Sequence, residues 1–271
     1  MIRWAELVFH VLAHVRSGVP AAVFDPTWTA FVARHTTGER TIDEDAGLIA
    51  SVATTHDALA EVQLLAWLFE GAGRTAAVAD RPLDALRPAD VDAPELLPVL
   101  VASRYRAAIE VLRAAAELEV GVVAALPPAE HDPRAMDAAF ARVSAAAPEL
   151  LGCRIEHVRP LMLRGRARGR RIWVGVPCAR LGPTVEHVAW QAAHEATVVE
   201  IAERARARGL SVRYLPLEQS ALFVLRARAE RCGLGAAHAA WLGHFSALPS
   251  LERAAIEPAF VALIDQSLDA R

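Results

Sequence analysis

The chain has 271 residues, of which 54% are hydrophobic, so it can bury a full core in one large domain or two small ones. Its net charge of −3 excludes a global positive field that would attract nucleic acid or an anionic membrane. All 29 basic residues are arginine. Without lysine, a Schiff-base enzyme, a pyridoxal phosphate (PLP) enzyme and a phosphate-loop nucleotide site are excluded for this chain.

Helical periodicity dominates the first half of the sequence. The spacing of apolar residues predicts helices over 2–17, 41–69, 98–120 and 133–146, a turn and short helix over 24–35, and a proline-rich loop over 75–98. The first helix is apolar but is interrupted by Glu6, His10 and His14, which argues against a signal peptide or a membrane span. We therefore expect no membrane association and a cytoplasmic location.

The character of the sequence changes near residue 152. Residues 153–163 and 170–177 are rich in β-branched residues and predict a hairpin around the polar turn RGRARG, residues 164–169. A helix is expected over 184–207, with Thr184 as N-cap and Gly209 as its stop. A strand over 211–217 would lie parallel to the second hairpin strand through a right-handed βαβ crossover, and helices follow over 218–231, 236–245 and 250–267.

These elements predict a mostly α-helical α+β protein. A helical N-terminal half would pack on a small three-stranded sheet, made of the hairpin and the βαβ unit, and C-terminal helices would close the other side. The expected regions are a helical region (1–126), a connecting helix and linker (127–150), a small α/β unit with an arginine hairpin (151–217) and C-terminal helices (218–271). They are expected to form one integrated globular unit.

The helix over 184–207 carries the first candidate site. His187 and His194 share one side of this helix but lie about 10 Å apart along its axis. His194-Glu195 matches the first two positions of the zinc motif H-E-x-x-H, but Val198 occupies the position of the second histidine. Both broad faces are apolar, so a pair of hydrogen-bonded core histidines is the alternative.

His10 and His14 have the spacing that places two imidazoles over one spot on a helix. They could belong to a polar stripe that faces water, or they could meet His187 or His194 from the other helix. In the second case three or four nitrogen ligands would hold zinc or iron, with Glu195 as general base or in support of the ligands.

The cysteines are three in number, widely spaced and expected to be reduced. Cys178 follows a predicted strand near a helix N-terminus, where a thiolate would be stabilised. It could act as a nucleophile with His187 or be an inert core thiol.

A cluster of arginines marks the predicted hairpin. Between Arg154 and Arg171 the chain has seven arginines and one glutamate. A basic hairpin beside a sheet edge would suit an acidic peptide or protein partner, although a solvated tip is the plainer interpretation. Interleaved aromatic residues are missing, which disfavours single-stranded nucleic acid. The expected partner-binding residues are Arg164, Arg166, Arg168, Arg170 and Arg171.

Two main functions remain open from the sequence, with nucleic-acid binding through the arginine hairpin as a weaker third. The first is a metal-dependent cytosolic enzyme, hydrolytic or oxidative, with a histidine-lined site between the N-terminal helix and the 184–207 helix. The second is a non-catalytic scaffold or partner subunit that binds a peptide or protein through the sheet edge and the arginine hairpin.

Overall fold

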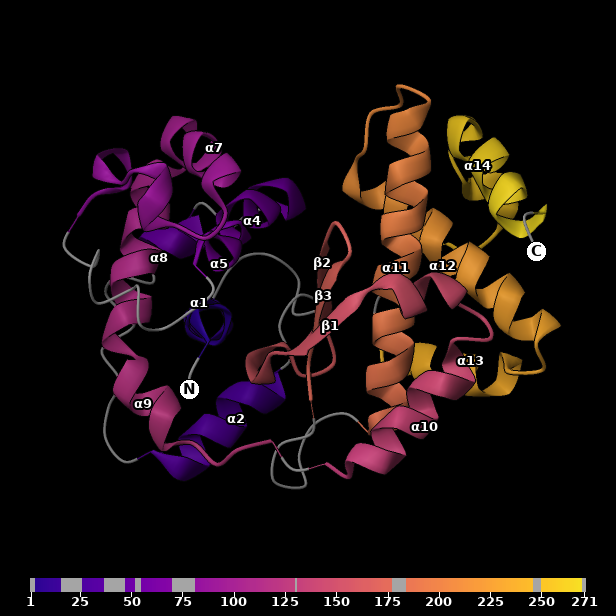
Figure 1. Ribbon diagram of the computed structural model, residues 1–271, viewed down its shortest axis with the longest axis horizontal. Coiled ribbons are helices and arrows are strands. Elements are labelled where there is room, and N and C mark those ends of the chain that lie inside the picture. The colour runs from indigo at the N-terminus through magenta and orange to yellow at the C-terminus, as the bar shows by residue number, and fades with distance from the viewer. Residues whose placement is uncertain are drawn as a thin grey trace. The chain divides into compact units, whose positions relative to one another are not determined.

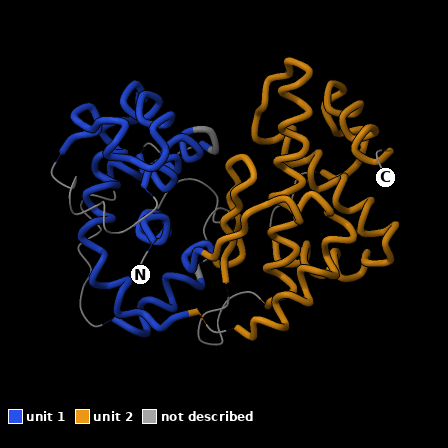
Figure 2. The backbone as a smooth tube through the Cα atoms, viewed as in Figure 1, with its two compact units in different colours: residues 1–128, 158–161 blue, residues 129–157, 162–271 orange. Residues whose placement is uncertain are grey.

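The structure, a computed structural model, describes residues 3–15, 26–36, 47–51, 55–69, 81–129, 131–176, 184–245 and 250–269 (Figure 1). It is mostly helical, with a small three-stranded mixed sheet, which confirms the predicted α+β class. Contacts divide the chain into two compact units: unit 1, residues 1–128 and 158–161, and unit 2, residues 129–157 and 162–271 (Figure 2). No helix in the described ranges has both the length and the apolar character needed to cross a membrane.

Unit 1 is built around its first helix. This helix, α1, contacts α2, α5, α8 and α9, and Trp4, Leu7 and Phe9 on it are fully buried. Burial on several sides explains why α1 is apolar over most of its circumference. The helices of unit 1 are α1 (Trp4–His14), α2 (Pro26–His35), α4 (His56–Gln63), α5 (Leu65–Leu68), α7 (Leu97–Ala102), α8 (Arg106–Leu118) and α9 (Val120–Ala125).

Two long helices predicted in this unit are broken in the structure. The predicted 41–69 helix is interrupted at Thr55, whose backbone is extended and whose side chain accepts from Ala58 N as the N-cap of α4. Its proposed capping box at 41–44 lies outside the described residues. The predicted 98–120 helix breaks at Ser103, where the backbone turns extended.

The proline-rich stretch is more regular than predicted. In its described part, residues 81–98, three short 3₁₀ turns precede α7. Proline is tolerated at the start of such a turn because its missing N–H would have no partner there. The turns are η1 (Leu83–Ala85), η2 (Pro88–Asp90) and η3 (Pro94–Leu96).

The sheet belongs to unit 2 and differs from the predicted hairpin. Its order is β1-β3-β2, with β1 (Arg154–His157) parallel to β3 (Arg171–Val174) and β2 (Gly165–Arg168) antiparallel to β3. Most of the predicted turn RGRARG is therefore strand β2, and the actual turn follows it. Gly169 adopts a φ of 54° there, which glycine tolerates.

The third predicted strand, 211–217, is wrong. Helix α12 (Tyr214–Arg231) begins inside it, and Pro216 lies in its first turn, where proline costs no intrahelical hydrogen bond. Because β1 already pairs with β3 in parallel, the predicted βαβ crossover through the 184–207 helix is wrong as well. The expectation that the N-terminal helices pack on the sheet stays a prediction.

Helix α11 (Val185–Ala207) is the centre of unit 2. Thr184 caps it, as predicted, and all residues from 187 to 197 are buried. It contacts β2 and β3 on one side and α10, α12, α13 and α14 elsewhere, which explains its apolar faces. Around it lie α10 (Pro133–Val143), η4 (Pro148–Gly152), α12, α13 (Gly235–Leu242), η6 (Arg253–Ala255) and α14 (Pro258–Asp269); the 3₁₀ turn η5 (Arg159–Leu161) belongs to unit 1.

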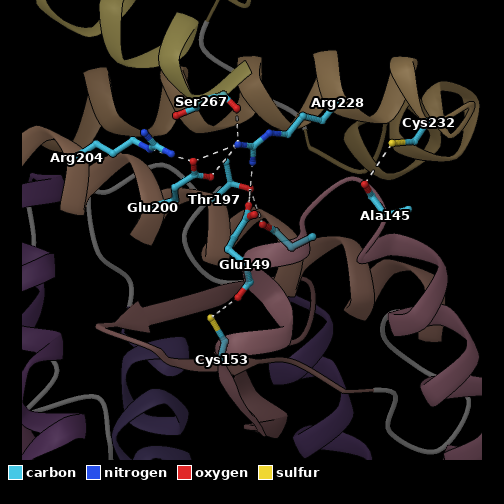
Figure 3. A network of polar contacts seen from close by, with 10 residues as sticks. Ala145, Glu149, Cys153, Thr197, Glu200, Arg204, Arg228, Cys232 and Ser267 are labelled. Atoms are coloured by element: carbon cyan, nitrogen blue, oxygen red, sulfur yellow. Dashed lines mark hydrogen bonds and ion pairs between the residues drawn. The ribbon is translucent and has the colours of Figure 1, made fainter. Parts of the chain in front are cut away.

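A buried polar network ties α11 to its neighbours (Figure 3). Arg228 of α12 is 2% exposed; it donates to Glu149 Oε1 of η4 at 3.0 Å and to the Ser267 carbonyl of α14 at 2.8 Å. Its guanidinium also lies 2.9 Å from Glu200 Oε2 of α11, and the Thr197 hydroxyl donates to Glu149 at 3.0 Å. These bonds fix α11 against α12 one turn beyond His194.

Candidate acid–base site

The candidate site centres on His194, in the buried middle of α11. His194 Nε2 lies 3.1 Å from Glu218 Oε1 of α12, and the His194 side chain is 5% exposed. A carboxylate only accepts, so Nε2 carries the proton. His194 Nδ1 is buried and has no hydrogen-bond partner within the described part of the chain. The ring is thus held by one nitrogen while the other is left for chemistry.

Glu195 lies next in sequence and is also buried. Gln191 Nε2, one turn earlier on α11, donates to Glu195 Oε1 at 3.1 Å. On its other side Glu195 lies against Gly165 of β2: a Cβ at residue 165 would be 2.6 Å from Glu195 Cγ. Only glycine therefore leaves room for this carboxyl group between helix and strand.

The environment shifts the pKa values of the two glutamates in opposite directions. Burial raises the pKa of Glu195, and the charges of His194 and Arg166 offset this only in part. Burial also acts to raise the pKa of Glu218, but the charge and hydrogen bond of His194, with smaller effects of Arg166 and Arg164, bring it below its ordinary value. Relative to a free glutamate, these shifts favour the protonated form of Glu195 and the ionised form of Glu218.

Two further side chains respond to the same charges. Burial lowers the pKa of His194, but the charge and hydrogen bond of Glu218 and the charge of Glu195 outweigh it, so that the pKa lies above its ordinary value. Burial, with the charge of Glu218, raises the pKa of Tyr214 to about 12. Tyr214 lies one helical turn before Glu218 on α12. Because its pKa is about 12, its phenol stays protonated at neutral pH.

The arginines predicted as one partner surface have different environments. Arg164 and Arg166 flank Gly165, and the charge of each lowers the pKa of Glu218. Arg171 lies 3.2 Å from Glu156 Oε1 of β1, whereas Arg170 is exposed at the turn. Arg168, paired with Arg171 in the β2–β3 register, is half-buried. Only the first two therefore act electrostatically on the candidate site.

The predicted metal ligands lie in different units. His10 and His14 belong to unit 1, and His187 and His194 belong to unit 2. His10 is fully buried, which rules out the wet polar stripe for this residue. His14 is half-buried, and its Nδ1 lies 2.8 Å from the His10 carbonyl. His187 is buried, with Nε2 3.4 Å from the Leu163 carbonyl.

A metal site was also sought among all described side chains. Across those residues, no group of three or more histidine, cysteine, aspartate or glutamate side chains has an arrangement that could hold an ion. The zinc or iron site made of His10, His14, His187 and His194 stays a prediction. Cys178 lies outside the described residues, so its reactivity stays a prediction too.

Sequence reasoning missed Glu218, Tyr214 and Gly165. Glu218 and Tyr214 were missed because the helix was expected to begin at 218. A start at 214 would have placed both on one helical face at i and i+4. Gly165 was assigned to a turn, so its close approach to Glu195 had no sequence signal.

The chain was also compared with known proteins. It matches no protein-family model, no curated protein and no solved structure. The side chains around His194 therefore carry the functional argument.

Proposed function

We propose that unit 2 is a hydrolytic enzyme that works by general acid–base catalysis, with His194 as base, Glu218 as the carboxylate that orients it and Glu195 as acid. One observation carries this proposal: His194 is held through Nε2 by Glu218, while its buried Nδ1 has no partner among the described residues. A histidine that a carboxylate holds by one nitrogen is well placed to accept a proton on the other.

The two glutamates support a division of roles. Carboxyl groups with pKa values moved apart by their surroundings commonly serve as acid and as ionised partner in one site. Here burial favours the protonated form of Glu195, and the pair with His194 favours the ionised form of Glu218. Glu195 was predicted from sequence as a base; its raised pKa supports the opposite role.

The proposed reaction conserves protons. His194 Nδ1 removes a proton from water as the water oxygen bonds to the electrophilic atom of the substrate. Glu195 gives its proton to the leaving group as the bond to that group breaks. The proton on His194 then returns to Glu195 through solvent, and Glu218 stabilises the transient imidazolium.

The test is turnover of two chromogenic probes, p-nitrophenyl acetate and p-nitrophenyl phosphate. Glu195→Gln and His194→Gln should each lower turnover by about 10²- to 10⁴-fold. Glu186→Gln, on the same helix but paired with Arg142, and His244→Gln, exposed in the same unit, should leave turnover within about twofold. Equal rates for Glu195→Gln and Glu186→Gln, or no turnover by the unaltered protein, would contradict the proposal.

The metal-dependent form of this hypothesis has its own test. Chelation by EDTA should leave turnover unchanged if side chains alone do the chemistry. Loss of turnover on chelation, restored by zinc or iron, would instead favour the metal-dependent enzyme. In that case His10→Ala and His194→Ala should both lower the metal content of the purified protein.

Binding of an acidic peptide or protein is a second proposed function. It is favoured by the sheet order, in which β2 is a terminal strand and its turn carries the exposed Arg170. Charge reversal at Arg168 and Arg170 should abolish capture of a polyglutamate peptide without changing the melting temperature by more than a few degrees. Unchanged capture would refute this function.

A further inference from the structure

We propose that the site at His194 binds a small oxyanion against the aromatic side chains between α11 and α13, and that the substrate of the proposed hydrolysis carries such a group. This inference rests on the proposed function, whose substrate class it names. The ligand chemistry is that of a carboxylate, sulfate or phosphate group, which accepts hydrogen bonds and carries negative charge.

The aromatic cluster consists of Trp190 and His194 of α11 and His238 and Trp241 of α13. Its ring centroids follow one another at 5.2 Å (Trp190–His238), 5.4 Å (His238–Trp241) and 5.7 Å (His194–Trp241). The i, i+4 spacing on α11 and the i, i+3 spacing on α13 place each pair on one helical face. The rings therefore form one contiguous group that ends at the catalytic histidine.

Every member of this cluster has a buried polar nitrogen without a partner in the described chain. These atoms are Trp190 Nε1, His194 Nδ1, His238 Nε2 and Trp241 Nε1. An indole N–H can only donate, and an unpaired buried donor costs enough free energy that most proteins avoid it. The two unpaired indole donors, beside the imidazoles of His194 and His238, favour a ligand that accepts hydrogen bonds.

Positive charge lies beside the same rings. Arg164 Cζ is 4.6 Å from the ring centroid of Phe245, which packs against Trp241 at 5.1 Å. Arg164 and Arg166 act on the site with positive charge and Glu218 with negative charge. Protonation of His194, which its raised pKa favours, adds a further positive charge that an anion would balance.

The free acceptors near His194 are Gln191 Oε1 and, while the imidazole is neutral, His194 Nδ1; neither has a partner within the described residues. Protonation of His194 turns Nδ1 into a donor. An oxyanion then meets three donors, Trp190 Nε1, His194 Nδ1 and Trp241 Nε1, against one acceptor. Ring centroids less than 6 Å apart also restrict the ligand to a compact group.

The pH dependence of binding follows from the groups that face His194. Of these, His238 has its pKa lowered to about 4 and Tyr214 has its pKa raised to about 12, so neither titrates between pH 6 and 8. An anion stabilises protonated His194 and neutral Glu195, so affinity should increase as pH falls through their pKa values. The facing groups are Glu195 on α11, Tyr214 and Glu218 on α12, His238 on α13, and Arg164 and Arg166 at β2.

The experiment is calorimetric titration of the whole chain with acetate, sulfate and inorganic phosphate at pH 6 and pH 8. We expect saturable binding of at least one anion, tighter at pH 6, and the tightest of the three identifies the anionic group of the substrate. Arg164→Gln should weaken it about tenfold or more, because a charge-assisted hydrogen bond is lost. The matched control Arg170→Gln, exposed on the same hairpin, should change the dissociation constant by less than twofold.

Two results would overturn the inference: no saturable binding of any of the three anions, or equal weakening by Arg164→Gln and Arg170→Gln. Trp241→Phe adds a check, since it removes one N–H donor but keeps an aromatic ring, and it should weaken binding several-fold. Glu195→Gln separates the two proposals. It should remove turnover yet keep anion binding. Anion binding with turnover unaffected by this variant would contradict only the proposed function, and turnover lost in a protein that binds none of the three anions would contradict only this inference.

Discussion

His10 of unit 1 and His194 of unit 2 are both buried, and both lie against a glutamate. His10 Nε2 is 2.9 Å from Glu119 Oε2, and Trp28 Nε1 donates to His10 Nδ1 at 3.1 Å. His194 Nε2 is 3.1 Å from Glu218 Oε1, but its Nδ1 has no partner in the described residues. The two histidines therefore differ at Nδ1, which Trp28 occupies in His10 and which has no partner among the described residues in His194.

In the proposed function, that difference separates a structural histidine from the catalytic one. The indole of Trp28 occupies the nitrogen that His10 would need for proton transfer or metal binding, so the ring is fixed as a neutral tautomer. His194 keeps that nitrogen available beside a second carboxyl group. A buried histidine next to a glutamate is therefore a candidate catalyst only when its other nitrogen is open.

The largest expected loss of stability comes from replacing His10, the histidine whose two ring nitrogens both have partners. His10→Ala removes both hydrogen bonds and leaves Trp28 Nε1 and Glu119 without their partner, at a cost of about 3–5 kcal/mol in unfolding free energy. His194→Ala creates a similar cavity but frees Glu218, which is 24% exposed and can turn to water, so it should cost about 1–3 kcal/mol less. Hydrogen exchange read by mass spectrometry measures each unit separately; equal costs would remove the distinction.

A smaller effect tests the packing that places Glu195. Gly165→Ala puts a Cβ within 2.6 Å of Glu195 Cγ, which must move, at a cost of about 1–3 kcal/mol. The control is Gly121→Ala on α9, where nothing lies within 4 Å of the added Cβ and helix propensity should improve stability by about 1 kcal/mol or less. Thermal melts compare the two variants. An unchanged melting temperature for Gly165→Ala would mean that Glu195 is not held as described.

The smallest expected effect is measured on the unaltered protein: it is the difference between the pKa values of His194 and His238, two members of the aromatic cluster. Burial and the charge of His194 lower the pKa of His238 to about 4, whereas that of His194 lies above its ordinary value near 6.5. An NMR titration of the imidazole nitrogens should resolve both groups. Coincident pKa values near 6.5 for both histidines would contradict the proposed electrostatics.

The signs of their stability contributions are opposite. His194 contributes stability below pH 6.5 that is lost as pH rises through its raised folded-state pKa. His238 contributes stability above pH 6.5 that is lost as pH falls toward about 4. His194→Gln should therefore flatten the alkaline limb of a stability–pH curve for unit 2, and His238→Gln the acid limb.

Local signals predicted the central helix of unit 2 well. Thr184 as N-cap and an apolar pattern on both faces set the start and burial of α11, because capping and periodicity are properties of neighbouring residues. The same signals failed at residues 211–217, where β-branched and aromatic residues favoured a strand. In the structure both sides of β3 are paired, by β1 and β2, and helix α12 begins at Tyr214, so the local preference was overridden.

The sequence by itself determined the mostly helical α+β class, the absence of lysine chemistry and the place of His194 and Glu195 on a buried helix. The tertiary structure alone decided which side chains face them. Glu218 lies 24 residues beyond His194, and Gly165 lies 30 residues before Glu195. Contacts at such separations depend on how elements pack, since the energy of a hydrogen bond or a close approach depends on distance in space and leaves no periodic pattern along the chain.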